Sequence, residues 1–194
     1  VAPFWVYPNF ARNARAALAL GALGRVGTHL VMPSGLGSGT PLIQHGRHGL
    51  DGDAAGVALV VECGQHFLRA SAELATATAL DFLAHFGLIA PAPRGVSAAP
   101  QRRFELLQTC MVHTDEFKFA RPLIGFETFA EGELIATDGD AGEIRAPCDD
   151  CTVLMPAREP IVGREAVYLT RPIRFQHEKC RQRLIDKRGQ LCKQ

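Results

Sequence analysis

The sequence lacks three features that would place it in common functional classes. It has no run of about eighteen apolar residues, which a membrane-spanning helix requires. Residues 1–5 lack the basic start and apolar core of a signal peptide. They also lack an initiator Met, which either a processed or excised chain or a boundary chosen for expression would explain. The net charge of +1 provides no overall field that recruits nucleic acid or an anionic membrane. We therefore expect neither a membrane protein nor a nucleic-acid binder.

The composition is that of an ordinary globular protein. Apolar residues make up 47% and charged residues 21% of the 194 positions, enough for one good-sized domain or two small ones. The six cysteines are even in number, but a chain with this much apolar material does not need a disulfide framework. We predict reduced cysteines and a cytoplasmic protein.

The first part of the chain alternates helical and strand-like segments. Residues 9–20 are alanine-rich and predict a helix that Gly21 can end. Residues 28–32 (THLVM) predict a short buried strand, and residues 33–40 (PSGLGSGT) a loop that turns sharply or approaches a ligand.

The clearest unit is a strand that ends in a carboxylate. Residues 57–61 (VALVV) are typical of a strand covered on both faces, and Glu62 follows directly. Residues 71–86 have helical spacing, with Gly87 as a stop. Strand, turn and helix in this order predict an α/β layout, in which function gathers at the carboxyl ends of strands.

The composition changes beyond residue 92. Residues 93–100 are rich in Pro and Ala and predict a linker. Short apolar runs then alternate with Gly, Asp and Pro turns over residues 101–173, which predicts a small all-β domain. Residues 174–194 form a basic tail with one aromatic residue, too few for stacking on single-stranded nucleic acid, so a solvated terminus is expected. Residues 1–92 are the predicted α/β portion.

Glu62 is the leading catalytic candidate on physical grounds. A carboxylate at the end of an apolar strand loses hydration and needs a partner or a proton. Such a group suits a general base that takes a proton from water. A structural salt bridge, or hydrogen bonds from backbone N–H groups, is the alternative role that the residues alone leave open.

Residues 56–87 (GVALVVECGQHFLRASAELATATALDFLAHFG) resemble the second half of the succinylglutamate desuccinylase/aspartoacylase family: an apolar strand, Glu-x-Gly and a helix ending near ALDF. The downstream segment resembles the family's C-terminal β domain, so that the similarity covers most of residues 30–173. Its matching elements are Phe117-Lys118-Phe119, Gly125-Phe126-Glu127, Ala146-Pro147, Val153-Leu154-Met155-Pro156 and Gly163-Arg164-Glu165-Ala166.

The resemblance implies part of a mixed sheet with flanking helices, as in zinc carboxypeptidases, and zinc-dependent hydrolysis of the amide in N-acyl amino acids. It implies that Glu62 is the general base and that an arginine before it binds the substrate carboxylate. Arg47 is the candidate, although an insertion over residues 51–55 must be assumed, and a solvent-facing arginine is the alternative. Thr40, His45 and His48 share its loop and are further candidates for substrate contact, against purely structural roles.

The chain departs from the family in its metal ligands. The family's His-x-x-Glu element and later histidine precede the region matched here, so the zinc ligands are expected outside this chain. His113 and Glu116 form the one His-x-x-Glu, but it lies in the β portion, where residues 112–119 look extended. We therefore interpret it as coincidence and expect no metal ligands, a self-contained site with a loop histidine being the alternative.

Cys148-Asp-Asp-Cys151 matches half of a zinc site or a redox pair. No second pair at matching spacing follows, so we interpret the motif as a surface turn.

The sequence thus predicts a zinc-dependent deacylase that supplies the general base but not the zinc ligands, with a small N-acyl amino acid or similar amide as its partner. Assembly into a homo-oligomer is a further expectation. A non-catalytic fragment, or a module that binds a ligand or partner without metal, is the alternative.

Overall fold

The computed structural model describes residues 2–33, 41–49, 56–92 and 100–173. The first part of the chain forms β1 (Phe4–Pro8), α1 (Ala11–Gly21), β2 (Thr28–Met32), η1 (Leu42–Gln44), η2 (Gly46–His48), β3 (Val60–Glu62) and α2 (Arg69–His85). The second part forms β4 (Arg102–Met111), β5 (Phe117–Phe119), β6 (Thr128–Phe129), β7 (Leu134–Asp138), η3 (Gly139–Ala141), β8 (Glu143–Arg145), β9 (Cys151–Leu154) and β10 (Glu165–Pro172).

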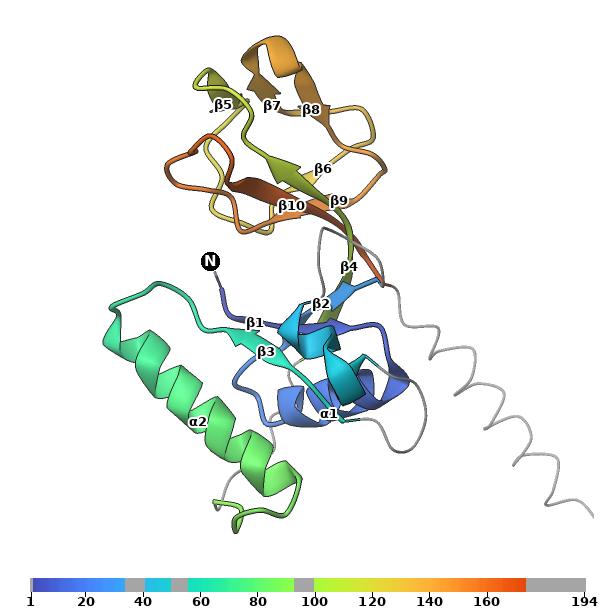
Figure 1. Ribbon diagram of the computed structural model, residues 1–194, viewed down its shortest axis with the longest axis vertical. Helices are drawn as coiled ribbons and strands as arrows, with labels where there is room; N and C mark the ends of the chain where they lie inside the picture. The colour runs from blue at the N-terminus through green and yellow to red at the C-terminus, as the bar shows by residue number, and fades with distance from the viewer. Residues whose placement is uncertain (1, 34–40, 50–55, 93–99, 174–194) are drawn as a thin grey trace, which may run out of the picture.

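Among the described residues, the strands form a seven-stranded mixed sheet and a smaller three-stranded sheet (Figure 1). The order in the large sheet is β3-β1-β2-β4-β10-β9-β6, and that in the small antiparallel sheet is β5-β7-β8. The predicted class, α/β with a mixed sheet and flanking helices followed by β structure, is confirmed.

The parallel pair β1–β2 is the centre of the α/β portion. Trp5 and Tyr7 on β1 pack with Leu20 on α1 in a buried apolar cluster, and the Trp5 indole N–H donates to the Val26 carbonyl at 3.2 Å. The predictions of a helix over residues 9–20 and of a buried strand over 28–32 are confirmed by α1 and β2.

The predicted strand over residues 57–61 differs from what the structure shows. Strand pairing covers only Val60–Glu62, and β3 lies at the edge of the large sheet, antiparallel to β1. All three residues are half-buried, so the prediction of a strand covered on both faces is wrong for the described chain. A continuous apolar run does not reveal whether a second element covers its outer face.

The predicted helix after Glu62 is present as α2. Leu74 and Phe82 on this helix pack against the cluster around Trp5, and Gly87 follows the helix end with a φ of 71°, a conformation that favours glycine. An ion pair of 2.9 Å between Arg25 and the buried Asp81 joins α2 to the turn after α1.

Two long strands connect the α/β portion to the β portion. β4 pairs in parallel with β2 at its start and antiparallel with β10 along its length. Phe104 and Leu106 on β4 pack with Phe4, Leu30 and Leu154 in a buried cluster that draws on both portions. One sheet therefore runs through both, and the division at residues 93–100 stays a prediction.

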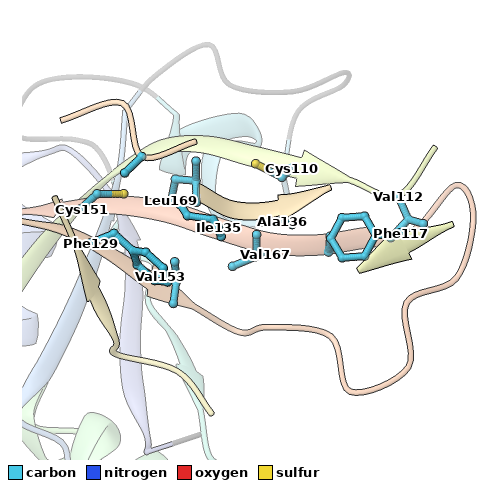
Figure 2. Close-up of a cluster of buried hydrophobic side chains, with 12 residues drawn as sticks. Cys110, Val112, Phe117, Phe129, Ile135, Ala136, Cys151, Val153, Val167 and Leu169 are labelled. Atoms are coloured by element: carbon cyan, nitrogen blue, oxygen red, sulfur yellow. The ribbon is translucent and has the colours of Figure 1, made fainter. Parts of the chain in front are cut away.

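The β portion has its own core, in which Phe129, Ile135, Val153 and Val167 are fully buried (Figure 2). The prediction of β structure over residues 101–173 rests on short apolar runs, and the structure has strands at most of them. The runs at 134–137, 152–155 and 166–170 overlap β7, β9 and β10, and the run at 110–113 begins in the last two residues of β4.

Some predictions fall on segments outside the described residues. These are the loop at 34–40 with Thr40, the insertion at 51–55, most of the linker at 93–99 and the basic tail at 174–194. Within the described segments, no helix combines the length and apolar character needed to cross a membrane.

Candidate functional site

Glu62 ends β3 beside the first residue of β1. Its register partner across the antiparallel ladder is Phe4, which is fully buried. The chain turns away at Gly64, whose φ of 109° is a conformation that L side chains rarely adopt. The half-buried carboxylate therefore lies on the last residue of a paired strand, and the chain leaves the sheet two residues later at a glycine turn.

Two cavities share Glu62 as a lining residue. Cavity A has a volume of about 420 Å³, and its walls include Phe4, Gln65, Ile124, Met155 and Arg158. Cavity B has a volume of about 850 Å³, and its walls include Leu30, Ile43, Gln108, Met155 and Tyr168. Both volumes are in the range of small-ligand sites. Residues of the α/β and β portions line both cavities, with Glu62 common to the two.

No cation among the described residues forms an ion pair with Glu62. The structural salt bridge that the sequence left open is therefore not made within this part of the chain. A carboxylate that faces a cavity without a cationic partner remains available to a ligand or to water.

Cavity B is also lined by Glu165 and Tyr168, both on β10. The Tyr168 hydroxyl donates to Glu165 Oε2 at 2.6 Å. Burial, the hydrogen bond to Glu165 and the negative charges of Glu165 and Glu62 together raise the pKa of Tyr168 well above its usual value. Tyr168 is therefore a neutral hydroxyl near Glu62 at physiological pH. Sequence reasoning did not select Tyr168 as a site residue, because only β pairing brings residue 168 near residue 62.

The predicted substrate-binding residues lie in the segment around η2. Arg47 and His45 are exposed, and His48 is half-buried beside Gly56. Arg12 donates to the carbonyls of His48 and Gly56, each at 2.9 Å, and so ties this segment to α1. None of these three candidates is among the described residues that line cavities A and B. Their roles in substrate binding stay a prediction.

The described residues do not offer a zinc site. No group of three or more His, Cys, Asp and Glu side chains that could hold a metal ion occurs in the described ranges. The residues present therefore do not fit a bound zinc by themselves.

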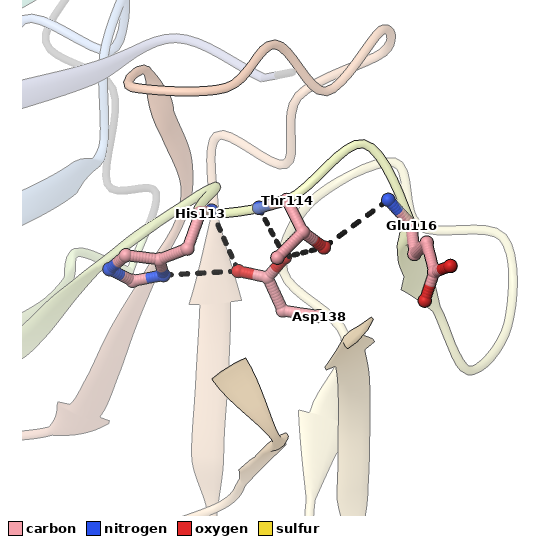
Figure 3. A network of polar contacts seen from close by, with 4 residues as sticks. All are labelled: His113, Thr114, Glu116 and Asp138. Atoms are coloured by element: carbon pink, nitrogen blue, oxygen red, sulfur yellow. Dashed lines mark hydrogen bonds and ion pairs between the residues drawn. The ribbon is translucent and has the colours of Figure 1, made fainter. Parts of the chain in front are cut away.

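His113 takes part in a hydrogen-bond network with Asp138 that fixes a turn (Figure 3). The buried Asp138 accepts the His113 backbone N–H at 2.7 Å, and the His113 Nδ1 lies 3.0 Å from the same oxygen. The backbone N–H and the hydroxyl of Thr114 donate to the other oxygen, both at 2.8 Å. Burial alone would raise the pKa of Asp138, but these four donors outweigh it and lower the pKa to about 2. The expected extended conformation over residues 112–119 is confirmed at 117–119, which form β5, and is wrong at 114–116, where the chain turns between β4 and β5.

The Cys148–Cys151 motif is only partly a surface turn. Cys148 is half-buried against the core of the β portion, whereas Cys151 is completely buried as the first residue of β9. Both are free thiols, as are Cys63 and Cys110. Burial is the main cause that raises the pKa of Cys110 and of Cys151 to about 11, so neither provides a reactive thiolate near neutral pH. The surface-turn interpretation is wrong for Cys151, because an apolar strand draws its first residue into the core.

The mixed sheet with its attached β portion is the fold of solved succinylglutamate desuccinylases and of a related aspartoacylase family structure. The structure of succinylglutamate desuccinylase from Vibrio cholerae superposes with a TM-score of 0.61 at 19% identity, over 90% of this chain and 50% of that one. The enzyme from Vibrio parahaemolyticus gives 0.59 at 20% identity, over 89% and 49%. The succinylglutamate desuccinylase/aspartoacylase from Rhodobacter sphaeroides gives 0.56 at 18% identity, over 89% and 54%.

The resemblance inferred from the sequence is thus confirmed at the level of the fold. The chain spans about half the length of these solved structures. No protein-family model and no curated protein sequence matches it.

Proposed function

We propose that this chain carries the general base of a deacylase that hydrolyses the amide bond of N-acyl amino acids. Glu62 is the base: its carboxylate takes a proton from the attacking water and passes it to the leaving amine. Zinc is the cofactor expected from the resemblance, and its ligands are expected on polypeptide outside this chain.

The observation that carries the proposal is that Glu62 lines both cavity A and cavity B and has no cationic partner among the described residues. An amide substrate has an acyl portion and an amine portion on the two sides of the scissile bond. A general base that acts at this bond needs space for both portions. Cavities A and B, which share Glu62, provide that room. The Tyr168 hydroxyl near Glu62 donates its proton to Glu165, and its oxygen can accept a hydrogen bond from a polar group of the substrate.

The experiment is the Glu62→Gln substitution in the full-length protein, with zinc content measured alongside hydrolysis of a panel of N-acyl amino acids. We expect kcat to fall by about a hundredfold or more while zinc stays bound, because the substitution removes the proton-transfer group and leaves the zinc ligands in place. Glu73→Gln is the matched control, since Glu73 is exposed on α2 in an i,i+4 pair with Arg69.

Near-normal turnover of the Glu62→Gln variant would contradict the role of Glu62. Absence of hydrolysis by the zinc-loaded wild-type protein on the whole panel would instead favour the non-catalytic binding module.

A further inference from the structure

We propose that Arg158, rather than Arg47, is the arginine of this chain that binds a carboxylate of the substrate. The proposal rests on the proposed function, because it assigns one portion of the amide substrate to cavity A. Glu62 and Arg158 line the same cavity of about 420 Å³, the first from the end of β3 and the second from the loop between β9 and β10.

The backbone around Arg158 is held in place over the cavity. β9 ends at Leu154, and Met155 turns the chain with a φ of 50°, an uncommon conformation for a side chain of this size. The Ala157 N–H then donates to the Ala166 carbonyl at 2.8 Å, which fixes the residue before Arg158 to β10. The guanidinium therefore extends from an anchored backbone position.

The charge of Arg158 is not neutralised within the described part of the chain. No carboxylate there forms an ion pair with it, although other exposed arginines of the β portion do pair: Arg145 with Glu143 and Arg171 with Glu105, both at 2.7 Å. An arginine that lines a cavity without such a partner is available for an anion from solution.

The walls of cavity A provide apolar surface as well as the charge of Arg158. Phe4, which is fully buried, and the exposed side chains of Ile124 and Met155 can contact the apolar part of a ligand whose anion binds to the exposed Arg158. Ile124 is held in place by Glu127, whose carboxylate accepts the backbone N–H groups of Ile124 and Gly125 at 2.8 and 2.9 Å. The planar fork of a guanidinium matches a carboxylate in two parallel hydrogen bonds.

The chemistry recognised is thus a carboxylate joined to a short apolar chain. An N-acyl amino acid has two sources of such a group: the α-carboxylate of the amino acid, and the terminal carboxylate of a dicarboxylic acyl group. Three substrates separate the two. N-succinylalanine carries both carboxylates, N-butanoylalanine only the α-carboxylate, and N-succinylalanine amide only the acyl carboxylate.

The first test measures kcat/KM of the full-length wild-type protein and its Arg158→Gln variant on these three substrates. We expect a loss of about 30-fold on every substrate that carries the bound carboxylate and less than about threefold on the one that lacks it. If kcat/KM falls on N-succinylalanine and N-succinylalanine amide, Arg158 binds the acyl carboxylate. If it falls on N-succinylalanine and N-butanoylalanine, Arg158 binds the α-carboxylate. An equal effect on all three, or none, would overturn the proposal.

The second test does not require hydrolysis. Binding of succinate and of neutral butanamide to the 194-residue chain is measured by NMR titration for the wild type, Arg158→Gln and Arg164→Gln. Arg164 is the matched control, because it is exposed in the same loop and is not among the described lining residues of cavity A.

Succinate is expected to bind in preference to butanamide, with affinity at least tenfold lower in Arg158→Gln and unchanged in Arg164→Gln. Equal succinate binding by all three proteins would overturn the role of Arg158 even if the full-length enzyme is an active deacylase. If the wild-type full-length protein hydrolyses none of the substrates, but succinate binding to the chain still depends on Arg158, only the proposed function is overturned.

Discussion

Gln101 and His29 hold the start of β4 beside β2. The Nε2 of His29 lies 2.7 Å from Gln101 Oε1, and the Gln101 amide donates to the Leu18 carbonyl at 3.0 Å. Because the amide oxygen of Gln101 only accepts, the proton of the neutral His29 ring resides on Nε2. This pair joins α1, β2 and the first residues of the β portion.

The first prediction concerns the pH dependence of stability. Burial is the main cause that lowers the pKa of His29 to about 4; the hydrogen bond with Gln101 opposes this shift, and the charge of Arg103 adds a smaller contribution to it. Between pH 6.5 and 4 the unfolded chain binds a proton at this position and the folded chain does not. The free energy of unfolding should therefore fall by about 3 kcal/mol as the pH falls through this range.

Urea denaturation between pH 7 and 4 measures this effect. The His29→Gln variant, which keeps an N–H donor, should show a flatter pH profile even if it is less stable at pH 7. The control is His85→Gln, at an exposed position near the end of α2, which should retain the wild-type slope. An unchanged slope in His29→Gln would show that other groups produce the pH dependence.

The second prediction concerns Gly21 at the end of α1. A Cβ at this position would meet the side-chain oxygen and carbon of Gln101, which is already tied to His29 and Leu18. Gly21→Ala should therefore destabilise the fold by about 1–3 kcal/mol, although alanine has the higher helix propensity.

Gly27→Ala is the matched control in the same denaturation experiment, because a Cβ there has only an ordinary contact with the Pro100 carbonyl at 3.6 Å. Equal stability of the two variants would mean that Gln101 moves aside without cost.

The third prediction concerns Asp138, which fixes the turn after β4. Asp138→Asn replaces an ionised acceptor of four hydrogen bonds by an amide, so the Tm should fall by about 5 °C or more. Asp140→Asn is the control, because Asp140 lies in η3 and is not one of the described partners in this network; the variant should leave the Tm within about 2 °C.

The depressed pKa of Asp138 also sets a pH window. Its contribution to stability is fully present above the unfolded value of 3.8 and is lost as the pH falls toward about 2. Thermal unfolding followed by circular dichroism from pH 5 to 2 should show a shallower decline in Asp138→Asn. Parallel wild-type and variant curves would contradict the role of this carboxylate.

The local elements were accessible from the sequence because their signals are local. Alanine-rich composition located α1, apolar runs located β2, β9 and β10, and the strand–Glu–Gly–helix order located Glu62. The edge position of β3 was not accessible, because VALVV is equally apolar whether or not another strand covers it. The buried state of Cys151 was missed for a similar reason, since a Cys-x-x-Cys turn does not show that its second cysteine begins a core strand.

By itself, the order of residues established the α/β class, the β portion that follows it and the carboxylate at the end of an apolar strand. The surroundings of that carboxylate came from folding alone. Arg158 and Tyr168 lie about a hundred positions away along the chain, and only the pairing of β4 with β2 and β10 brings them to the cavities around Glu62. Periodicity and propensity report on neighbours in sequence, whereas a binding site is made of neighbours in space.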